Sequence, residues 1–269
     1  MKNYNIGFIG CGKMAGAIIK GIIKSGFISF DRVLASKSSP DRLKEVSDNL
    51  GVEVILDNKA LVQKSDIIFI AVKPNQVENV LNEIKSQITP EKLIVSVAAG
   101  VTTSFIEGIL PVNARVIRVM PNTPVLVNEG MSGICAGKWV KEDDMSYICP
   151  LFETIGKCII VDESQIDIVT AISGSGPAFF YKVINDIALA GEKLGLEYEK
   201  SLLLSIQTAI GSAKMALNRD IPMEELINNV ATKGGCTRVG VDTMLESDTA
   251  RVFYEVIKST AEKAHDLGK

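Results

Sequence analysis

The sequence predicts an α/β domain built on a parallel sheet, followed by an all-helical domain. Over about the first 160 residues, short apolar runs alternate with segments whose apolar residues recur at helical spacing. This alternation is typical of a parallel sheet with helices on both faces. After residue 162 only helical patterns follow. We therefore expect the α/β domain to span residues 1–162 and the helical domain to span residues 163–269.

The elements of the first domain follow from apolar runs and from their boundary residues. DIIFIAV (66–72) is almost wholly apolar, as expected of a strand covered on both faces. Pro40 and Gly51 bracket a helical pattern, and Gly26 ends an earlier one. The predicted strands are 4–10, 32–36, 66–72, 92–100, 114–121, 131–136 and 157–161, and the predicted helices are 13–26, 40–51, 75–86, 102–109 and 141–155.

The second domain reads as a series of helices without a strand. Asp248 is a suitable N-cap for the last helix, because its carboxylate can accept hydrogen bonds from the free amides of the first turn. The predicted helices are 176–194, 198–218, 222–230, 237–246 and 248–266.

Composition excludes several classes of function. The 269 residues carry a net charge of −3 from 29 basic and 32 acidic side chains, without a basic block that would bind nucleic acid. No run approaches the ~20 apolar residues that cross a membrane, and the first residues do not resemble a secretory signal. Five cysteines without a CxxC pair predict reduced thiols and a cytoplasmic location. A single histidine predicts no metal site.

The first predicted strand runs into a nucleotide-binding pattern, Gly10-x-Gly12-x-x-Ala15. Gly10 permits a tight turn, Gly12 lets a pyrophosphate approach the backbone, and Ala15 lets the helix pack closely on the sheet. The start of the helix then offers free amides and a partial positive charge to the phosphates. Because the pattern joins a strand to a helix at the start of an alternating domain, it predicts a Rossmann-type dinucleotide-binding domain.

The second strand indicates which dinucleotide binds. NAD-binding domains carry an acidic residue about 20 residues after the glycines, where it contacts the ribose hydroxyls. Here the strand ends in Ser36 and Lys37 without an acid, and a lysine with hydroxyls suits a 2′-phosphate. We expect NADPH as the cofactor, with NADH as the alternative. Lys73 lies just beyond another strand, on the ligand side of such sheets, and is a further candidate.

A second glycine-rich segment, ATKGGCTRVG (231–240), precedes a helix of the second domain. Gly234, Gly235 and Cys236 would present free backbone amides to a small carboxylate, and Thr237 adds a hydroxyl that can donate and accept. The alternative is an ordinary helix start that is capped by Thr237 or Thr232.

Three further features allow a functional or a structural interpretation. ISGSGPAFFYKVINDIA (172–188) is a glycine-rich start to an apolar helix that suits close packing, and Ser173 or Ser175 could also take part in chemistry. In VMPNTPVLVNEG (119–130), Asn122 or Thr123 could reach a nicotinamide or could only shape a turn. His265 is expected to be solvated, so an active site here works without histidine.

Taken together, these motifs resemble the pyrroline-5-carboxylate reductase family. The matching segments, in the order of the family, are FIGCGKMA, AVKPNQ, VSVAAGV, RVIRVMPNTPVLVNEG, ISGSGPAFF and KGGCT. The resemblance implies NADPH-dependent reduction of 1-pyrroline-5-carboxylate to L-proline, the last step of proline synthesis. It also implies a homodimer formed through the helical domain, with dimers often assembling into a decamer, and a site between the domains at the dimer interface.

The resemblance also assigns roles to individual positions. Thr237 matches the threonine that contacts the ring nitrogen and is the catalytic candidate. The expected substrate-binding residues are Glu163, Asn229, Gly234, Gly235, Cys236 and Thr237. The expected cofactor-binding residues are Gly10, Gly12, Lys13, Met14, Ser36, Lys37, Asn58, Ala71, Lys73 and Ala99.

The chain departs from the family pattern in the substrate loop, where Lys233 replaces a proline and Cys236 fills a small-residue position. This puts the fine substrate preference in question more than the reaction. Two alternatives stay open. The first is an enzyme with another substrate, either a reductase of another cyclic imine or a dehydrogenase of 3-hydroxy acids with Lys182 as its base. The second is a regulatory protein that binds the dinucleotide without turnover.

Overall fold

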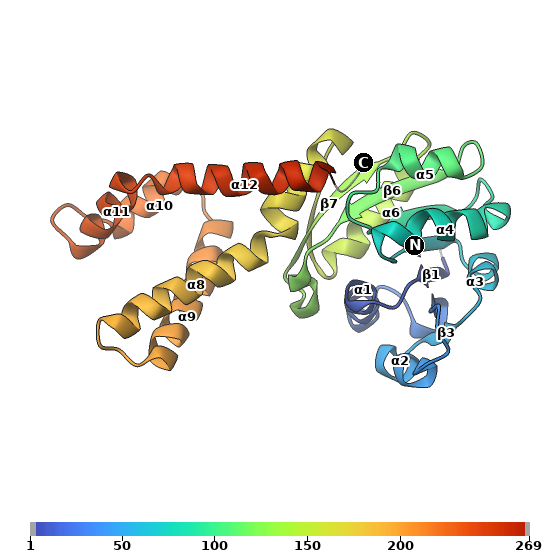
Figure 1. Cartoon of the computed structure of the whole chain (residues 1–269), viewed down its shortest axis with the longest axis horizontal. Coiled ribbons are helices and arrows are strands. Elements are labelled where there is room, and N and C mark those ends of the chain that lie inside the picture. The colour runs from blue at the N-terminus through green and yellow to red at the C-terminus, as the bar shows by residue number, and fades with distance from the viewer. Residues whose placement is uncertain (1–3, 267–269) are drawn as a thin grey trace. The chain divides into compact units, whose positions relative to one another are not determined.

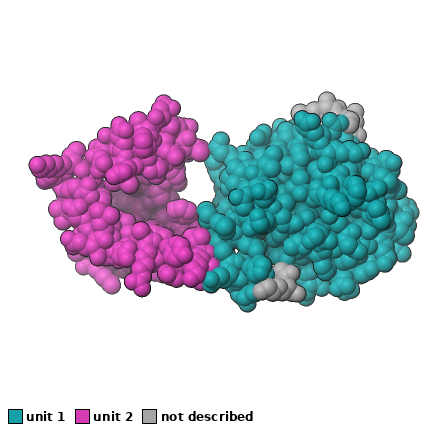
Figure 2. Space-filling view, turned by 90° about the horizontal axis from the view of Figure 1, so that it is seen from above, with its two compact units in different colours: residues 1–175, 260–269 teal, residues 176–259 magenta. Residues whose placement is uncertain are grey.

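The computed structural model describes residues 4–266 and divides into two compact units (Figures 1 and 2). Unit 1 comprises the chain up to Ser175 together with the chain from Thr260 onward, and unit 2 comprises Gly176–Ser259. The predicted boundary between residues 162 and 163 therefore lies ahead of the division between the compact units.

Unit 1 contains an eight-stranded sheet in the order β3-β2-β1-β4-β5-β6-β7-β8. Its strands are β1 Ile6–Ile9, β2 Val33–Ser36, β3 Glu53–Ile55, β4 Ile67–Ile70, β5 Leu93–Ser96, β6 Arg115–Met120, β7 Gly130–Ala136 and β8 Gly156–Ile160. All neighbouring pairs are parallel except β6 and β7. The predicted α/β class is thus confirmed, with one reversal of strand direction.

That reversal has a topological cause. Only residues 121–129, with a short 3₁₀ helix over Thr123–Val127, connect β6 to β7. A parallel return needs a crossover of roughly a dozen residues or more, whereas this connection is short enough to turn the chain back beside β6. The next crossover, through helix α6 (Glu142–Glu153), makes β8 parallel to β7.

The sheet is covered on both faces, as the buried strands predicted (Figure 1). One hydrophobic core joins Phe8 and Phe69 to helices α1 and α6, and the other joins Ile68 and Ile70 to helices α3, α4 and α5. The helices of unit 1 are α1 Lys13–Lys24, α2 Leu43–Leu50, α3 Asn58–Lys64, α4 Pro74–Ile84, α5 Thr103–Ile109, α6 Glu142–Glu153 and α7 Ile166–Val169, followed by a π-helix over Thr170–Gly174.

The structure corrects several predicted boundaries. Helix α2 starts at Leu43 rather than Pro40, because Arg42 adopts a left-handed conformation (φ 56°) that breaks the helical backbone. The helical backbone near ISGSGP starts earlier than expected, at Ile166. Gly174 in this segment packs closely, since a Cβ there would lie 2.6 Å from the terminal carbon of Met120.

Unit 2 consists of helices, as predicted: α8 Gly176–Lys193, α9 Tyr198–Leu217, α10 Met223–Val230, α11 Cys236–Glu246 and the first part of α12 Thr249–Asp266. Asp248 caps α12 as expected, with its carboxylate accepting from the amide of Arg251 at 3.3 Å. No helix among the described residues is long and apolar enough to cross a membrane.

Candidate active site

A cavity of about 490 Å³ lies at the carboxyl ends of β1, β2 and β4 in unit 1. This is the edge of the sheet where doubly wound proteins bind nucleotides. It is lined by seven of the predicted cofactor-binding residues, namely Gly10, Gly12, Ser36, Lys37, Asn58, Ala71 and Lys73.

The two glycines of the fingerprint play different roles in this cavity. Gly10 has a positive φ of 104°, and a Cβ there would lie 2.7 Å from the carbonyl oxygen of Ala71, so the turn itself requires glycine. A Cβ on Gly12 would meet no atom within 4 Å and would project into open space. Gly12 also precedes α1 without a side-chain cap, so the helix start is accessible to a phosphate. The cavity therefore fits a dinucleotide.

Cys11 closes the turn between these glycines. Its thiol donates to the carbonyl oxygen of Ser36 at 3.1 Å. Burial raises the pKa of this thiol to about 11, against a smaller opposing effect of Lys37. Cys11 thus stays neutral near pH 7 and adds no negative charge beside the expected phosphates.

A chain of hydrogen bonds crosses the cavity wall next to β2. The hydroxyl of Ser36 donates to Asn58 Oδ1 at 2.6 Å, and Asn58 Nδ2 donates to Glu83 Oε2 at 2.9 Å. Beside this chain, the Lys37 ammonium donates to the carbonyl oxygen of Asp41. Ser36 and Lys37, the residues that suggested a 2′-phosphate, therefore already have protein partners.

One wall of the cavity was not predicted from the sequence. It is formed by polar residues of α4: Gln76, Asn79 and Glu83. Their spacing places them on one helical face, but such a face is also typical of an ordinary solvated surface. The expected contacts Lys13, Met14 and Ala99 do not line the cavity. Lys13 and Met14 instead form the first turn of α1, whose amides point out of the helix start.

In unit 2, the predicted carboxylate loop forms a tight turn. The amide of Gly235 donates to the carbonyl oxygen of Thr232 at 3.0 Å, and Gly234 has a φ of 78°. These are features of a type II turn, in which glycine is preferred at the third position and proline is common at the second. Lys233 occupies that second position, where the family pattern has proline.

Helix α11 begins directly after this turn and is not capped by a side chain. Gly235 is its N-cap residue, which rules out Thr237 and Thr232 as side-chain caps. The amides of Cys236 and Thr237 have no acceptor in the described part of the chain, as is usual for the first turn of a helix. The exposed Thr237 side chain lies beside these amides, and Asn229 is exposed on α10. The start of α11 thus offers free donors that suit a small anion.

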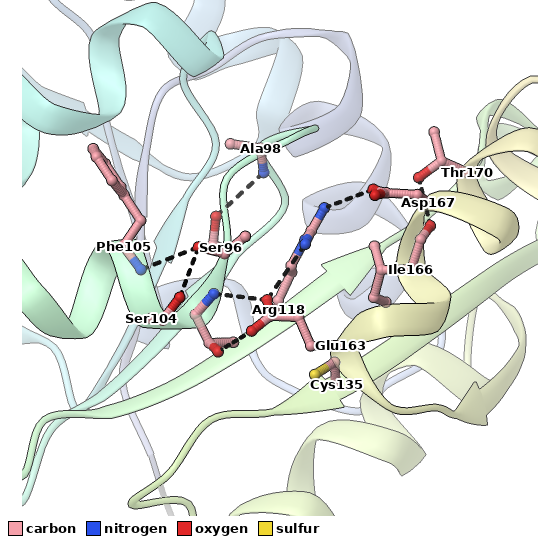
Figure 3. A network of polar contacts seen from close by, with 12 residues as sticks. Ser96, Ala98, Ser104, Phe105, Arg118, Cys135, Glu163, Ile166, Asp167 and Thr170 are labelled. Atoms are coloured by element: carbon pink, nitrogen blue, oxygen red, sulfur yellow. Dashed lines mark hydrogen bonds and ion pairs between the residues drawn. The ribbon is translucent and has the colours of Figure 1, made fainter. Parts of the chain in front are cut away.

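Glu163 lies in unit 1, in a network with Arg118 (Figure 3). Glu163 Oε1 accepts from the amide of Thr103 at 2.7 Å and from Arg118 Nη1 at 3.3 Å, while Oε2 accepts from the Thr103 hydroxyl. Arg118 is 3% exposed and also lies 3.9 Å from Asp167. Glu163 therefore has three donors within the protein, so its carboxylate anchors the start of α5 to the segment before α7.

The single histidine belongs to the edge of this network. His265 Nδ1 lies 3.2 Å from Asp167 Oδ2, although 63% of the histidine side chain is exposed. The side chain is exposed, as expected, but its contact with Asp167 was not predicted. His265 does not line the dinucleotide cavity.

The structural interpretation of Asn122 is favoured by its contacts. Its Nδ2 donates to the carbonyl oxygen of Ser173 at 3.2 Å, and its Oδ1 accepts from the amide of Met131 at 2.8 Å. The Ser173 hydroxyl accepts from the same Nδ2 at 3.3 Å. These bonds join the turn after β6 to β7 and to the π-helix, which leaves little capacity to bind a nicotinamide.

Comparison with known proteins places the chain. A family model described as pyrroline-5-carboxylate reductase dimerisation matches residues 163–267, and one described as NADP oxidoreductase, coenzyme F420-dependent, matches residues 5–100. The pyrroline-5-carboxylate reductase of Methanosarcina acetivorans is 39% identical over 269 residues, covering 100% of both chains. The chain belongs to the pyrroline-5-carboxylate reductase family. The Bacillus subtilis enzyme named pyrroline-5-carboxylate reductase 1 is 34% identical, over 98% of this chain and 89% of its own.

Solved structures of the family agree with the fold of the chain. A pyrroline-5-carboxylate reductase from Coxiella burnetii superimposes with a TM-score of 0.94 at 33% identity, covering 100% of both chains. The pyrroline carboxylate reductase of Plasmodium falciparum, solved with NADP bound, gives a TM-score of 0.89 at 32% identity, also over 100% of both chains. The family resemblance drawn from six short motifs is thus confirmed over the full length.

Proposed function

We propose that this protein reduces 1-pyrroline-5-carboxylate to L-proline with NADPH, the last step of proline synthesis. The observation that carries the proposal is the 39% identity over the full length to a protein of that name. The cavity around Gly10 and Gly12 supports the cofactor, and the solved relative with NADP bound supports its identity. NADH remains the alternative cofactor.

The dinucleotide would be held by the turn over Gly10–Gly12, by the first turn of α1 and by Ser36 and Lys37. When bound, NADPH supplies a hydride. Hydride addition to C5 of the cyclic imine moves the electron pair of the C=N double bond onto nitrogen, which carries a proton. The imine is basic enough to arrive protonated, so no side-chain base is needed, in contrast to the oxidation of an alcohol.

The protein's contribution would then be to hold and orient the substrate. The amides of Cys236 and Thr237 at the start of α11 would bind the carboxylate, since a helix start favours an anion. The Thr237 hydroxyl would contact the ring nitrogen. Asn229, which is exposed on α10 of the same unit, would also bind the substrate. Fixing the ring against the nicotinamide and excluding water supply most of the catalysis in such a step.

We further propose that the protein works in the cytoplasm as a homodimer formed by its dimerisation domain, with a decamer as the possible larger assembly. The five cysteines are all free, which suits a reducing compartment. The match to a dimerisation model over residues 163–267 supports the dimer.

The other candidate reactions receive less support from the structure. Oxidation of a 3-hydroxy acid would need Lys182 as a free base, but its ammonium contacts both oxygens of Asp186 at 2.6 Å on the exposed face of α8. A regulatory protein would bind the dinucleotide without turnover. The discriminating assay follows NADPH oxidation with and without the imine, and oxidation only in its presence identifies the enzyme.

Replacing Thr237 tests the assigned site directly. We expect Thr237→Ala to lower kcat on the order of tenfold to a hundredfold, because the hydroxyl is expected to orient the reacting nitrogen. The Kd of NADP⁺ should change by less than about twofold, because that site lies on other residues. Steady-state kinetics and calorimetric titration with NADP⁺ measure the two quantities.

A threonine on the same helix supplies the control. The Thr243 hydroxyl donates to the carbonyl oxygen of Val239 at 2.9 Å, so Thr243→Ala removes a hydroxyl from α11 without touching the loop. Thr237→Ser should recover much of the lost kcat. If Thr237→Ala reduces the imine as fast as the wild type, the role assigned to Thr237 is wrong.

A further inference from the structure

The chain of hydrogen bonds from Glu83 through Asn58 to Ser36 has a defined direction. An ionised carboxylate only accepts hydrogen bonds, so the Asn58 atom that faces Glu83 must be its NH₂ group. The carbonyl oxygen of Asn58 then faces Ser36, and the Ser36 hydroxyl must donate its only hydrogen to it. Glu83 thereby sets which way the Ser36 hydroxyl points, although the two side chains do not touch in this chain of bonds.

This direction matters because Ser36 lines the cavity that fits the dinucleotide. With its hydrogen committed to Asn58, the Ser36 oxygen offers only lone pairs to a ligand. A ribose 2′-hydroxyl, as in NADH, can donate to such an oxygen. A 2′-phosphate, as in NADPH, needs a donor, and Ser36 becomes one only if its bond to Asn58 breaks.

Charge acts in the same sense. Glu83 lines the cavity together with Lys37, so a negative side chain shares the wall with the positive one that suggested NADPH. A 2′-phosphate brings up to two negative charges, whereas a 2′-hydroxyl brings none. Glu83 is exposed, so water and salt weaken its repulsion of the phosphate without abolishing it.

We infer that Glu83 is a specificity-determining residue that holds the Ser36 hydroxyl in its donor orientation toward Asn58 and so limits the preference of this protein for NADPH over NADH. The inference rests on the proposed function, because it assumes that the cavity around Gly12 binds NADPH and NADH. Glu83 lies on α4, outside the nucleotide fingerprint, and its negative charge opposes the positive charge of Lys37.

Glu83→Gln is the decisive variant. Glutamine keeps the shape but is neutral, and its NH₂ group can donate to Asn58. Asn58 can then turn its carbonyl oxygen toward position 83 and its NH₂ group toward Ser36, which frees the Ser36 hydroxyl to donate to a phosphate. We expect the ratio of the Kd for NAD⁺ to the Kd for NADP⁺ to rise on the order of fivefold, measured by calorimetric titration without turnover.

Glu78→Gln is the matched control, because Glu78 is exposed on the same helix and lies outside the cavity lining. It removes the same charge from α4 and should leave the ratio nearly unchanged. Thermal unfolding of both variants checks that each is folded. A Glu83→Gln ratio equal to that of Glu78→Gln overturns the inference and leaves the proposed reduction standing.

The role of Ser36 is tested by repeating the Glu83 substitution in a Ser36→Ala background. If Glu83 acts through the Ser36 hydroxyl, the change in the Kd ratio should shrink clearly there, since no hydroxyl remains to be turned. If Glu83→Gln changes the Kd ratio as much in the Ser36→Ala background as in the wild type, the inferred action of Glu83 through Ser36 is overturned. A wild type that binds neither dinucleotide overturns the proposed function, and the inference with it.

Discussion

Lys37 is the residue on which the proposed preference for NADPH would most directly depend. It follows β2, lines the cavity, and its ammonium already donates to the backbone at Asp41. A loop held in this way presents a positive charge at little further cost in side-chain entropy, because part of that freedom is already lost. Lys37 and Glu83 line the same cavity with opposite charge, so they would act on a bound 2′-phosphate with opposite sign.

We predict that Lys37→Ala raises the KM for NADPH about tenfold and the KM for NADH by less than about twofold, since only NADPH carries the 2′-phosphate that a cation stabilises. Initial-rate kinetics with both cofactors measure the two values. Lys44→Ala serves as the control, because Lys44 is exposed on α2 and outside the cavity lining. Equal effects of Lys37→Ala on the two cofactors would remove the argument from the 2′-phosphate.

Arg118 shows how a buried charge can fix the position of another charged side chain. Its guanidinium is almost fully buried on β6 and is compensated by Glu163 and Asp167. A buried charge is tolerated when it is paired and hydrogen-bonded. In return, Arg118 and Thr103 fix the position of Glu163 in unit 1. The sequence pointed to Glu163 only through the family resemblance, because neither partner is near it in the chain.

At the scale of elements, long periodic segments were predictable and short ones were not. The apolar strands and the helices of both units were expected from their patterns, while β3 and α3 were not assigned. β3 has three residues and a partly exposed edge position, and α3 has seven residues, so neither contains enough apolar positions to show a period. The glycine-based parts of the site were predictable for the opposite reason, because their backbone requirements are specific.

The turn before α11 offers a test at the same scale. Because Lys233 occupies the second position of a type II turn, we predict that Lys233→Pro stabilises the protein by about 0.4–1 kcal/mol, mainly by restricting the unfolded chain. Denaturant unfolding at a fixed protein concentration measures the change. The KM for the imine should stay close to that of the wild type if Lys233 points to solvent. A loss of stability would show that the backbone at residue 233 is not that of a type II turn.

Gly234 provides the counterpart of this variant. Its φ of 78° suits glycine, and a Cβ would meet no atom within 4 Å, so Gly234→Ala introduces backbone strain without a clash. Because no atom crowds position 234, a loss of stability in Gly234→Ala would report the backbone conformation of the turn and not a steric clash. Neither Lys233→Pro nor Gly234→Ala removes a backbone amide of α11.

At the scale of the whole molecule, the two units differ in how they bury apolar side chains. Unit 1 has two hydrophobic cores, one on each face of its sheet. In Gly176–Ser259, by contrast, no leucine, isoleucine, valine, phenylalanine or methionine is buried, and Figure 2 shows a hollow in this unit. Exposed large residues there include Phe180 at 68%, Leu203 at 68% and Leu245 at 69%. An apolar surface of this extent is typical of a protein–protein interface.

A helical unit without its own core should depend on a second copy for its stability, which is the physical reason for the proposed homodimer. We predict that the 29.0 kDa chain has at least twice this mass by light scattering, and that its Tm falls on dilution. Leu203→Glu should yield a smaller species or a loss of helical circular dichroism, because a charge would be buried in the interface. Val112→Glu, at an 84% exposed position of unit 1, should change neither mass nor Tm. A wild type that stays monomeric at every concentration and unfolds cooperatively would contradict the proposed dimer, since unit 2 would then be stable with its apolar side chains in water.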